Sequence, residues 1–305
     1  MVIIAVFPGQ GSQTPGFLTP WLELPGARAR LESFSEWADV DLIAAGTTWD
    51  ADRIRDTQVA QPLIVAAGIL SWSALPDRAR VGGVAGHSVG EFAAAAAAGI
   101  LTDEQALRLV GIRGRAMAAA AAEEETGMSA VIGGDEAAVV ARLGELDLTP
   151  ANHNGGGQIV AAGSLEALQA LAATPPPSTR VIPLQVAGAF HTRYMAPALS
   201  ALSNAAAEVQ PADPTLSIWT NRDGSIVASG SAYRDLLVDQ VASPVRWDLC
   251  MTAFADAGVS GIIELAPAGT LVGLAKRALR GVPSVAVKTP DDLAAATALL
   301  QGDSA

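Results

Sequence analysis

The stretch Gly86-His87-Ser88-Val89-Gly90-Glu91 separates two segments of different character. Residues 81–85 form a short apolar run typical of a buried strand, and the alanine-rich residues 92–98 predict a helix. A Gly-x-Ser-x-Gly pattern between a strand and a helix indicates a nucleophile elbow, a turn so tight that glycine is needed two residues either side of the serine. The turn exposes the Ser88 hydroxyl beside a helix N-terminus, where the Val89 amide can stabilise an oxyanion. We therefore expect an α/β sheet that presents Ser88 as a nucleophile.

Composition narrows the class of protein. The chain has 305 residues, 50% of them hydrophobic, which is enough to bury a large core in one or two domains. With 31 acidic and 19 basic residues the net charge is −12, which argues against binding to nucleic acid. The longest apolar run is too short to cross a bilayer, and residues 1–7 lack the basic start of a signal peptide. The single cysteine, Cys250, fits a reducing compartment, so we expect a soluble cytoplasmic protein that does not bind membranes.

Two further segments on the N-terminal side could contribute to a site. Residues 2–7 predict a central parallel strand, and the glycine-rich residues 8–13 follow at its carboxyl end, where ligands of open α/β sheets bind. An ordinary connecting turn is the alternative. Thr102 begins a capping box and a helix to about residue 122 that carries Arg113. Spacing alone leaves Arg113 either solvated or in the cleft, where burial would require a carboxylate partner.

From residue 125 the pattern of elements changes. Residues 125–187 read strand, helix, strand, strand, helix, strand, which is the ferredoxin-like order. We therefore expect a small ferredoxin-like subdomain at 125–187, inserted into a large α/β-hydrolase-like catalytic domain with a parallel sheet, formed by 1–124 and 188–305. Between its middle strands, residues 152–157 predict a polar loop. This loop either closes over a ligand or is an ordinary glycine hairpin, and we expect His153 to be a solvated loop residue.

Only three histidines are available as a base for Ser88. His87 adjoins the serine, and neighbouring side chains on so sharp a turn point apart, so we read it as structural. His153 or His191 must then serve, and His191 lies at the boundary between the two predicted domains, where clefts form. No histidine follows His191, and the His-Gly-Gly-Gly oxyanion motif of hydrolases is missing, which weakens the interpretation as a serine hydrolase.

Nearly the whole chain resembles the malonyl-CoA:acyl carrier protein transacylase family. Several separate motifs in the right order make the resemblance far more specific than any one of them. The motifs are Phe7-Pro8-Gly9-Gln10-Gly11-Ser12-Gln13, Gly86-His87-Ser88-Val89-Gly90-Glu91, Arg113-Gly114, Asn152-x-Asn154 with Gly157-Gln158, Gly188-Ala189-Phe190-His191, Gln240-x-x-x-Pro244-Val245-x-Trp247 and Pro267-x-Gly269-x-Leu271.

The resemblance implies a role for each group at the reaction centre. Ser88 would be the nucleophile and His191 its base, in a dyad without a carboxylate. The main-chain carbonyl of Gln240 would orient His191, and the amides of Gln10 and Val89 would form the oxyanion hole.

The resemblance also implies the substrate contacts. Arg113 would hold the malonyl carboxylate bidentately. Phe190 matches family members that prefer malonyl, since those taking methylmalonyl tend to have a smaller residue there. Asn152 and Asn154 would shape the pocket from the small subdomain, and no metal ligand is expected.

The implied reaction is a ping-pong transfer of malonyl from malonyl-CoA to the phosphopantetheine thiol of an acyl carrier protein, for fatty-acid or polyketide synthesis. It needs no tightly bound cofactor, and the enzyme is expected to be a monomer. One alternative is a serine hydrolase that clears acyl thioesters from carriers, for which Arg113 would have no use. Another is a non-enzymatic carrier-binding subunit, which would be expected to have lost Ser88 or His191. Because the net charge is −12, an acidic carrier calls for a local basic rim, with Arg193, Lys276, Arg277 and Arg280 as candidates.

Overall fold

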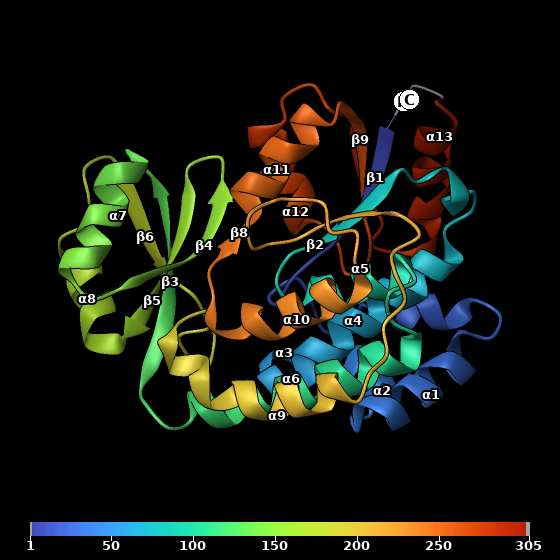
Figure 1. Cartoon of the computed structure of the whole chain (residues 1–305), viewed down its shortest axis with the longest axis horizontal. Helices are drawn as coiled ribbons and strands as arrows, with labels where there is room; N and C mark the ends of the chain where they lie inside the picture. Colours follow the sequence, from blue (N-terminus) through green and yellow to red (C-terminus); the bar gives the residue numbers. More distant parts are fainter. Residues whose placement is uncertain (1, 303–305) are drawn as a thin grey trace.

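The computed structural model describes residues 2–302, which build two five-stranded sheets (Figure 1). The larger sheet has the strand order β10-β9-β1-β2-β7, and all its pairs are parallel. Its strands are β1 (Val2–Phe7), β2 (Gly83–Gly86), β7 (Ser217–Trp219), β9 (Val259–Glu264) and β10 (Ser284–Ala286). Because parallel strands need crossover connections, helices cover both faces of this sheet.

Alternate residues of β1 face opposite layers of helices. Ile3, Ala5 and Phe7 belong to the larger buried core, and Ile4 and Val6 belong to the smaller one. The first layer includes α1 (Ala27–Ala38), α2 (Leu42–Thr47), α3 (Ala51–Arg55), α4 (Thr57–Ala74), α5 (Gly90–Ala97), α6 (Asp103–Ala121), α9 (Ala196–Ala207), α10 (Gly230–Asp239) and α13 (Leu293–Gln301). The second layer consists of α11 (Trp247–Asp256) and α12 (Thr270–Ala278). The result is a three-layer α/β arrangement, and its parallel sheet is the one that the sequence predicts.

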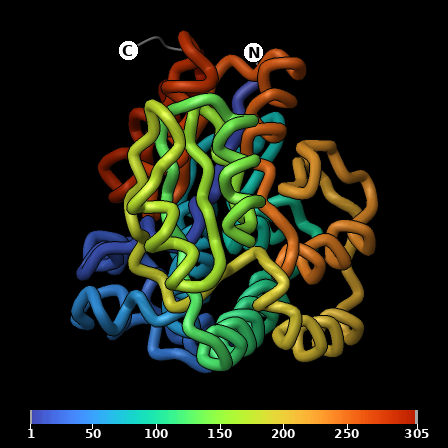
Figure 2. The backbone as a smooth tube through the Cα atoms, turned by 90° about the vertical axis from the view of Figure 1, so that its left-hand side faces the viewer, coloured from blue at the N-terminus to red at the C-terminus, as the bar shows by residue number. Residues whose placement is uncertain are grey.

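The second sheet, in the order β6-β3-β5-β4-β8, lies beside the first (Figure 1), and the green-to-yellow part of the chain that contains it faces the viewer in Figure 2. Its first four strands are antiparallel neighbours. In chain order its elements are β3 (Thr126–Gly133), α7 (Glu136–Glu145), β4 (Thr149–Gly155), β5 (Gln158–Ser164), α8 (Leu165–Ala173) and β6 (Thr179–Pro183). This is the ferredoxin-like order, so the predicted fold class is confirmed.

The two faces of the second sheet pack against different layers. Val131, Ile159 and Ala161 pack under α7 and α8, whereas Met128 and Val160 belong to the core shared with the large sheet. The fifth strand, β8 (Val245–Arg246), comes from beyond residue 187 and pairs with β4 in parallel. We keep the boundaries near 125 and 187 as a proposal, with β8 as a strand that the remainder of the chain adds to this sheet.

The expected loop at residues 152–157 is partly wrong. Strand β4 continues through Asn152, His153 and Asn154, because it is an interior strand with β5 on one side and β8 on the other. The turn itself is formed by Gly156 and Gly157, and these two and Gly155, the last residue of β4, all have positive φ.

Helix α6 starts where the sequence predicts. Thr102 Oγ1 accepts from the Gln105 amide, and Gln105 Oε1 accepts from the Thr102 amide, which is a complete capping box. No helix within residues 2–302 is long and apolar enough to cross a membrane.

Candidate active site

The turn between β2 and α5 has the geometry of a nucleophile elbow. Ser88 adopts a left-handed φ of 52°, which a non-glycine residue holds only when its surroundings enforce it. A Cβ on Gly86 would lie 2.0 Å from the main-chain carbon of Gly90, and one on Gly90 would lie 2.2 Å from the carbonyl oxygen of Phe7. Both glycines are therefore required, as predicted from the pattern.

His191 is the histidine that reaches Ser88. The Ser88 hydroxyl lies 2.7 Å from His191 Nε2, and His191 Nδ1 donates to the main-chain oxygen of Gln240 at 2.8 Å. Because that carbonyl can only accept, it holds the proton on Nδ1 and leaves the lone pair of Nε2 toward the hydroxyl. Burial, and then the charge of Arg113, lower the pKa of His191 from 6.5 to about 3, so the ring is neutral at physiological pH.

His87 is turned away from the serine. Its Nε2 bonds to Asn154 Oδ1 at 2.8 Å, and its ring packs edge-on against Trp247. Burial lowers the pKa of His87, so this ring too is held neutral. The structural role expected for His87 agrees with this position.

Arg113 is buried, with 1% of its surface exposed. Its Nη1 donates to Gln61 Oε1 at 2.6 Å, and its Nη2 donates to Gln240 Oε1 at 2.7 Å. Burial lowers the pKa of Arg113 from 12.5 to about 9, which still leaves a cation at pH 7. Among residues 2–302 no carboxylate lies within ion-pair distance of this guanidinium, and its Nε has no hydrogen-bond partner. The side chain is therefore a buried cation with unused donor capacity, which favours an anionic ligand.

One cavity joins most of the predicted site residues. Ser88, His191 and Arg113 line it together, and Met128, Val160 and Val186 contribute its apolar wall from the side of the second sheet. The remaining predicted residues on its surface are Gln10, Val89, Asn152 and Phe190. Asn152 Oδ1 is a second buried polar atom without a partner among the described residues, so it too is free to accept from a ligand.

Asn154 and Gln240 do not line this cavity. Asn154 is occupied by His87 and by Gln158 Oε1, to which its Nδ2 donates at 2.9 Å. Gln240 lies behind the cavity and touches its residues through hydrogen bonds. The structure thus brings Asn154 to the support of His87 rather than to the pocket.

Three supporting residues were not singled out from the sequence. Asn221 follows β7 and bonds to the main chain of Ser88 and of Gly86, each at 2.7 Å. Gln61 holds Arg113, and Glu91 accepts from Gln240. The available signals were a polar residue on an otherwise apolar helix for Gln61, a carboxylate within the elbow motif for Glu91, and a position at the carboxyl end of a strand for Asn221.

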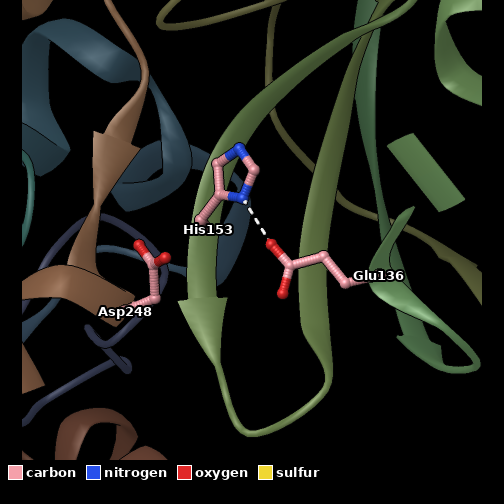
Figure 3. Close-up of side chains that lie close together, drawn as sticks. All are labelled: Glu136, His153 and Asp248. Atoms are coloured by element: carbon pink, nitrogen blue, oxygen red, sulfur yellow. Dashed lines mark hydrogen bonds and ion pairs between the residues drawn. The ribbon is translucent and has the colours of Figure 1, made fainter. Parts of the chain in front are cut away.

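A further group of polar side chains comes together beside β4: His153 on that strand, Glu136 on α7 and Asp248 on α11 (Figure 3). The ligand atoms of Glu136, His153 and Asp248 all lie within 4.8 Å of one another, which is compatible with a metal site. However, Asp248 accepts two hydrogen bonds from Arg246, at 3.0 and 2.7 Å, and His153 Nδ1 is bonded to Glu136 at 3.2 Å. Because the Arg246 cation already neutralises Asp248 and would repel a metal ion, we assign this group to the packing of α7 and α11 against β4.

Comparisons with known proteins agree with this site. The family model described as "Acyl transferase domain" matches residues 4–296. A malonyl CoA-acyl carrier protein transacylase of Mycobacterium bovis is 54% identical over 296 residues, which cover 96% of this chain and 98% of the relative. That of Salmonella typhimurium is 33% identical over 303 residues, 95% of this chain and 97% of the relative.

Solved structures give the same result. The crystal structure of MCAT from Mycobacterium tuberculosis superposes with a TM-score of 0.93 at 54% identity and covers 96% of this chain and 98% of its own. A malonyl-transacylase solved with its type II PKS acyl-carrier protein superposes with a TM-score of 0.90 at 29% identity, covering 99% and 100%. A family match over most of the chain, together with full-length relatives above 50% identity, shows that the chain belongs to the malonyl CoA-acyl carrier protein transacylase family.

Proposed function

We propose that this enzyme transfers malonyl from malonyl-CoA to the phosphopantetheine thiol of an acyl carrier protein through a malonyl-serine ester on Ser88. The observation that carries the choice of acyl group is Arg113, a buried cation with an unpartnered Nε in the same cavity as the nucleophile. The free carboxylate of a malonyl group would complete its hydrogen bonds. An acetyl group would leave the charge without a counter-ion, and this penalty is the source of selectivity.

In the first half-reaction Ser88 Oγ attacks the thioester carbonyl and its proton passes to His191 Nε2. The amides of Gln10 and Val89 donate to the oxyanion that forms. The carbon–sulfur bond then breaks, and the proton on His191 goes to the departing CoA thiolate. Free CoA and malonyl-Ser88 are the products.

In the second half-reaction the carrier's thiol gives its proton to His191 and attacks the ester carbonyl. The bond to Ser88 Oγ breaks, and the serine oxygen recovers the proton from His191. Since the dyad, the oxyanion donors and the carboxylate clamp are all supplied by the chain, we propose that the reaction needs no tightly bound cofactor or metal. We place it in the cytoplasm, because the single cysteine suits a reducing compartment.

The test is intact-protein mass after brief mixing with malonyl-CoA or, separately, acetyl-CoA. Wild type should gain a malonyl adduct, Ser88→Ala should gain none, and Arg113→Ala should lose the malonyl adduct or replace it with acetyl. Steady release of CoA without carrier and without an adduct would instead indicate the alternative, a hydrolase that clears acyl thioesters.

The malonyl group loaded onto the carrier would be used in fatty-acid synthesis, in polyketide synthesis or in both. Transfer rates measured with purified carriers from each pathway would distinguish them.

A further inference from the structure

The side chain of Gln240 connects three parts of the site. Its Nε2 donates to the main-chain oxygen of Ser88 at 3.0 Å and to Glu91 Oε2. Its Oε1 accepts from Arg113 Nη2 at 2.7 Å. The main-chain oxygen of the same residue holds His191. The residue expected from the sequence only as a main-chain support of the base therefore also supports the arginine.

This arrangement requires one orientation of the Gln240 amide. Arg113 can only donate, so it needs the oxygen end, and an ionised Glu91 can only accept, so it needs the nitrogen end. Glu91 is itself fixed, with 2% of its surface exposed. Its Oε1 accepts from the Asn221 amide at 2.8 Å and from the Tyr233 hydroxyl at 3.3 Å, which leaves Oε2 for Gln240.

The charges of Glu91 and Arg113 match this orientation of the Gln240 amide. Glu91 opposes the effect of burial on the pKa of Arg113, although no direct ion pair joins the two residues. A direct ion pair would occupy the guanidinium with an internal carboxylate. With a neutral amide between them, Glu91 balances the charge and leaves Arg113, which lines the cavity, without a carboxylate partner.

We propose that Glu91 is a positioning residue for substrate selection: it fixes the Gln240 amide so that its oxygen faces Arg113, and thereby aims the guanidinium at the acyl pocket. This inference rests on the proposed function, since it assumes that Arg113 binds the malonyl carboxylate. It assigns a role in acyl-group choice to a buried side chain that does not touch the substrate.

The decisive variant is Glu91→Gln, which keeps the size of the side chain. A glutamine whose oxygen accepts from Asn221 and Tyr233 presents its own N–H groups to Gln240. In either orientation of the Gln240 amide two donors then oppose each other. If its nitrogen stays on the Ser88 main-chain oxygen, it faces the N–H groups of residue 91. If the amide turns over, its nitrogen faces Arg113 and the Ser88 oxygen loses its partner. The main-chain carbonyl that holds His191 stays in place, because the Gln240 main chain is fixed at the end of α10 by bonds from its N–H to Leu236 and Val238.

We expect Glu91→Gln to lower kcat/KM for malonyl-CoA about tenfold or more, the size expected for a mispaired buried charge, and to change that for acetyl-CoA less than about threefold. The matched control is Glu104→Gln, which makes the same substitution at an exposed carboxylate of α6 and should alter both values little. Equal losses for the two thioesters in Glu91→Gln would overturn the inference and leave Glu91 with a structural role. If Arg113→Ala also keeps its preference for malonyl, the proposed function itself fails.

A second test measures the pH dependence of substrate selectivity in the wild-type enzyme, so its main result does not require that a variant fold correctly. Burial raises the pKa of Glu91 from 4.5 to about 7. The groups that face it are Asn221, Tyr233, Gln240, Arg113 and Cys250, and burial raises the pKa of both Tyr233 and Cys250, so neither titrates near pH 7. A protonated Glu91 presents a donor to the Gln240 nitrogen, so it no longer holds the amide with its oxygen toward Arg113.

In wild type, the ratio of kcat/KM for malonyl-CoA to that for acetyl-CoA should therefore decrease as the pH is lowered from about 8 to about 6. In Glu91→Gln the ratio should not change over this range. A ratio that is independent of pH in wild type would contradict the role of Glu91.

Discussion

The side-chain oxygen of Asn221 accepts a 2.7 Å hydrogen bond from the main-chain N–H of Ser88. Its Nδ2 donates to the main-chain oxygen of Gly86, also at 2.7 Å, so one amide spans the turn that carries the nucleophile. The positive φ of Ser88 costs about 1–3 kcal/mol and persists only where neighbouring groups hold it. Asn221 supplies two of these restraints from a loop that follows β7.

We expect Asn221→Ala to slow malonylation of Ser88 about tenfold and to lower the melting temperature by several degrees. The buried Gly86 carbonyl loses its partner, at about 1–3 kcal/mol, and about 2–4 °C is lost per kcal/mol in a chain of this size. The Ser88 N–H is partly buried and adds less. Rapid-quench mass spectrometry and thermal unfolding measure the two effects. The exposed neighbour Arg222→Ala is the control, and an unaltered acylation rate in folded Asn221→Ala would contradict the assignment.

Gly90→Ala should destabilise the fold, because its Cβ would meet the main chain of β1 at 2.2 Å and neither backbone can move aside. Overpacking of this kind costs about 1–3 kcal/mol or more, which predicts a fall in melting temperature of about 5–10 °C. Gly144→Ala in α7, where no atom lies within 4 Å of the added carbon, is the matched control. That variant should be unchanged or more stable by about 0.5–1 kcal/mol.

Acylation of Ser88 by acetyl-CoA should stay level from about pH 8 down to about pH 5. The pKa of His191 is lowered to about 3, so the base remains neutral throughout this range. Stopped-flow release of CoA measures the rate. A decrease with a midpoint near 6.5 would mean that His191 titrates as an exposed histidine does.

The same shift predicts how stability depends on pH. Because the folded state disfavours protonated His191, its contribution is complete above pH 6.5 and is lost as the pH falls toward 3. The difference in unfolding free energy between wild type and His191→Ala should decrease on acidification by at most about 1.4 kcal/mol per pH unit. Urea denaturation at several pH values tests this, and a constant difference would contradict the shift.

Phe190→Ala should admit methylmalonyl-CoA. The ring is buried and lines the acyl cavity, so its removal makes room for an additional methyl group. A single methylene changes discrimination by about tenfold or more, and we expect the ratio of methylmalonyl to malonyl kcat/KM to rise by that amount. Phe254→Leu, in the core on the other side of the sheet, should lower stability and leave the ratio unchanged.

Replacing Lys276, Arg277 and Arg280 with Glu should raise KM for the carrier about tenfold and leave malonyl-Ser88 formation unchanged. These side chains are exposed at the end of α12, and Arg277 lies against the glycine turn at Gly156. Arg193→Glu should have a smaller effect, because Arg193 is already paired with Asp147 through two hydrogen bonds. An unchanged KM in the triple variant would place carrier docking elsewhere.

The sequence predicted the structural features that are determined by short stretches of neighbouring residues. The apolar run before Gly86, the capping box at Thr102 and the order of elements after residue 125 each determine an element by themselves, and the structure has them. Elimination among the three histidines left His153 and His191 as candidate bases, and the resemblance to a family implied His191. The resemblance to a family supplied Arg113, whose burial the spacing of residues left undecided.

The contacts that support the site residues could not be predicted from the sequence, because tertiary packing brings together residues that are far apart in the chain. Gln61 lies 52 residues from Arg113, and Asn221 lies 133 residues from Ser88. Glu91 stands in the first turn of α5, where an acidic residue is favoured even when exposed, so nothing in the sequence distinguishes a buried carboxylate there.

Strand β8 limits how this enzyme can be recombined with its relatives. An exchange of residues 125–187 alone would place β4 of one parent beside β8 of the other, so the pairing at Asn152 and His153 would join strands from different parents. The same short strand directly follows the segment from Gln240 to Pro244, whose first carbonyl holds His191. A chimera that is to keep both its register and its catalytic base must therefore take the ferredoxin-like part and residues 240–246 from the same parent.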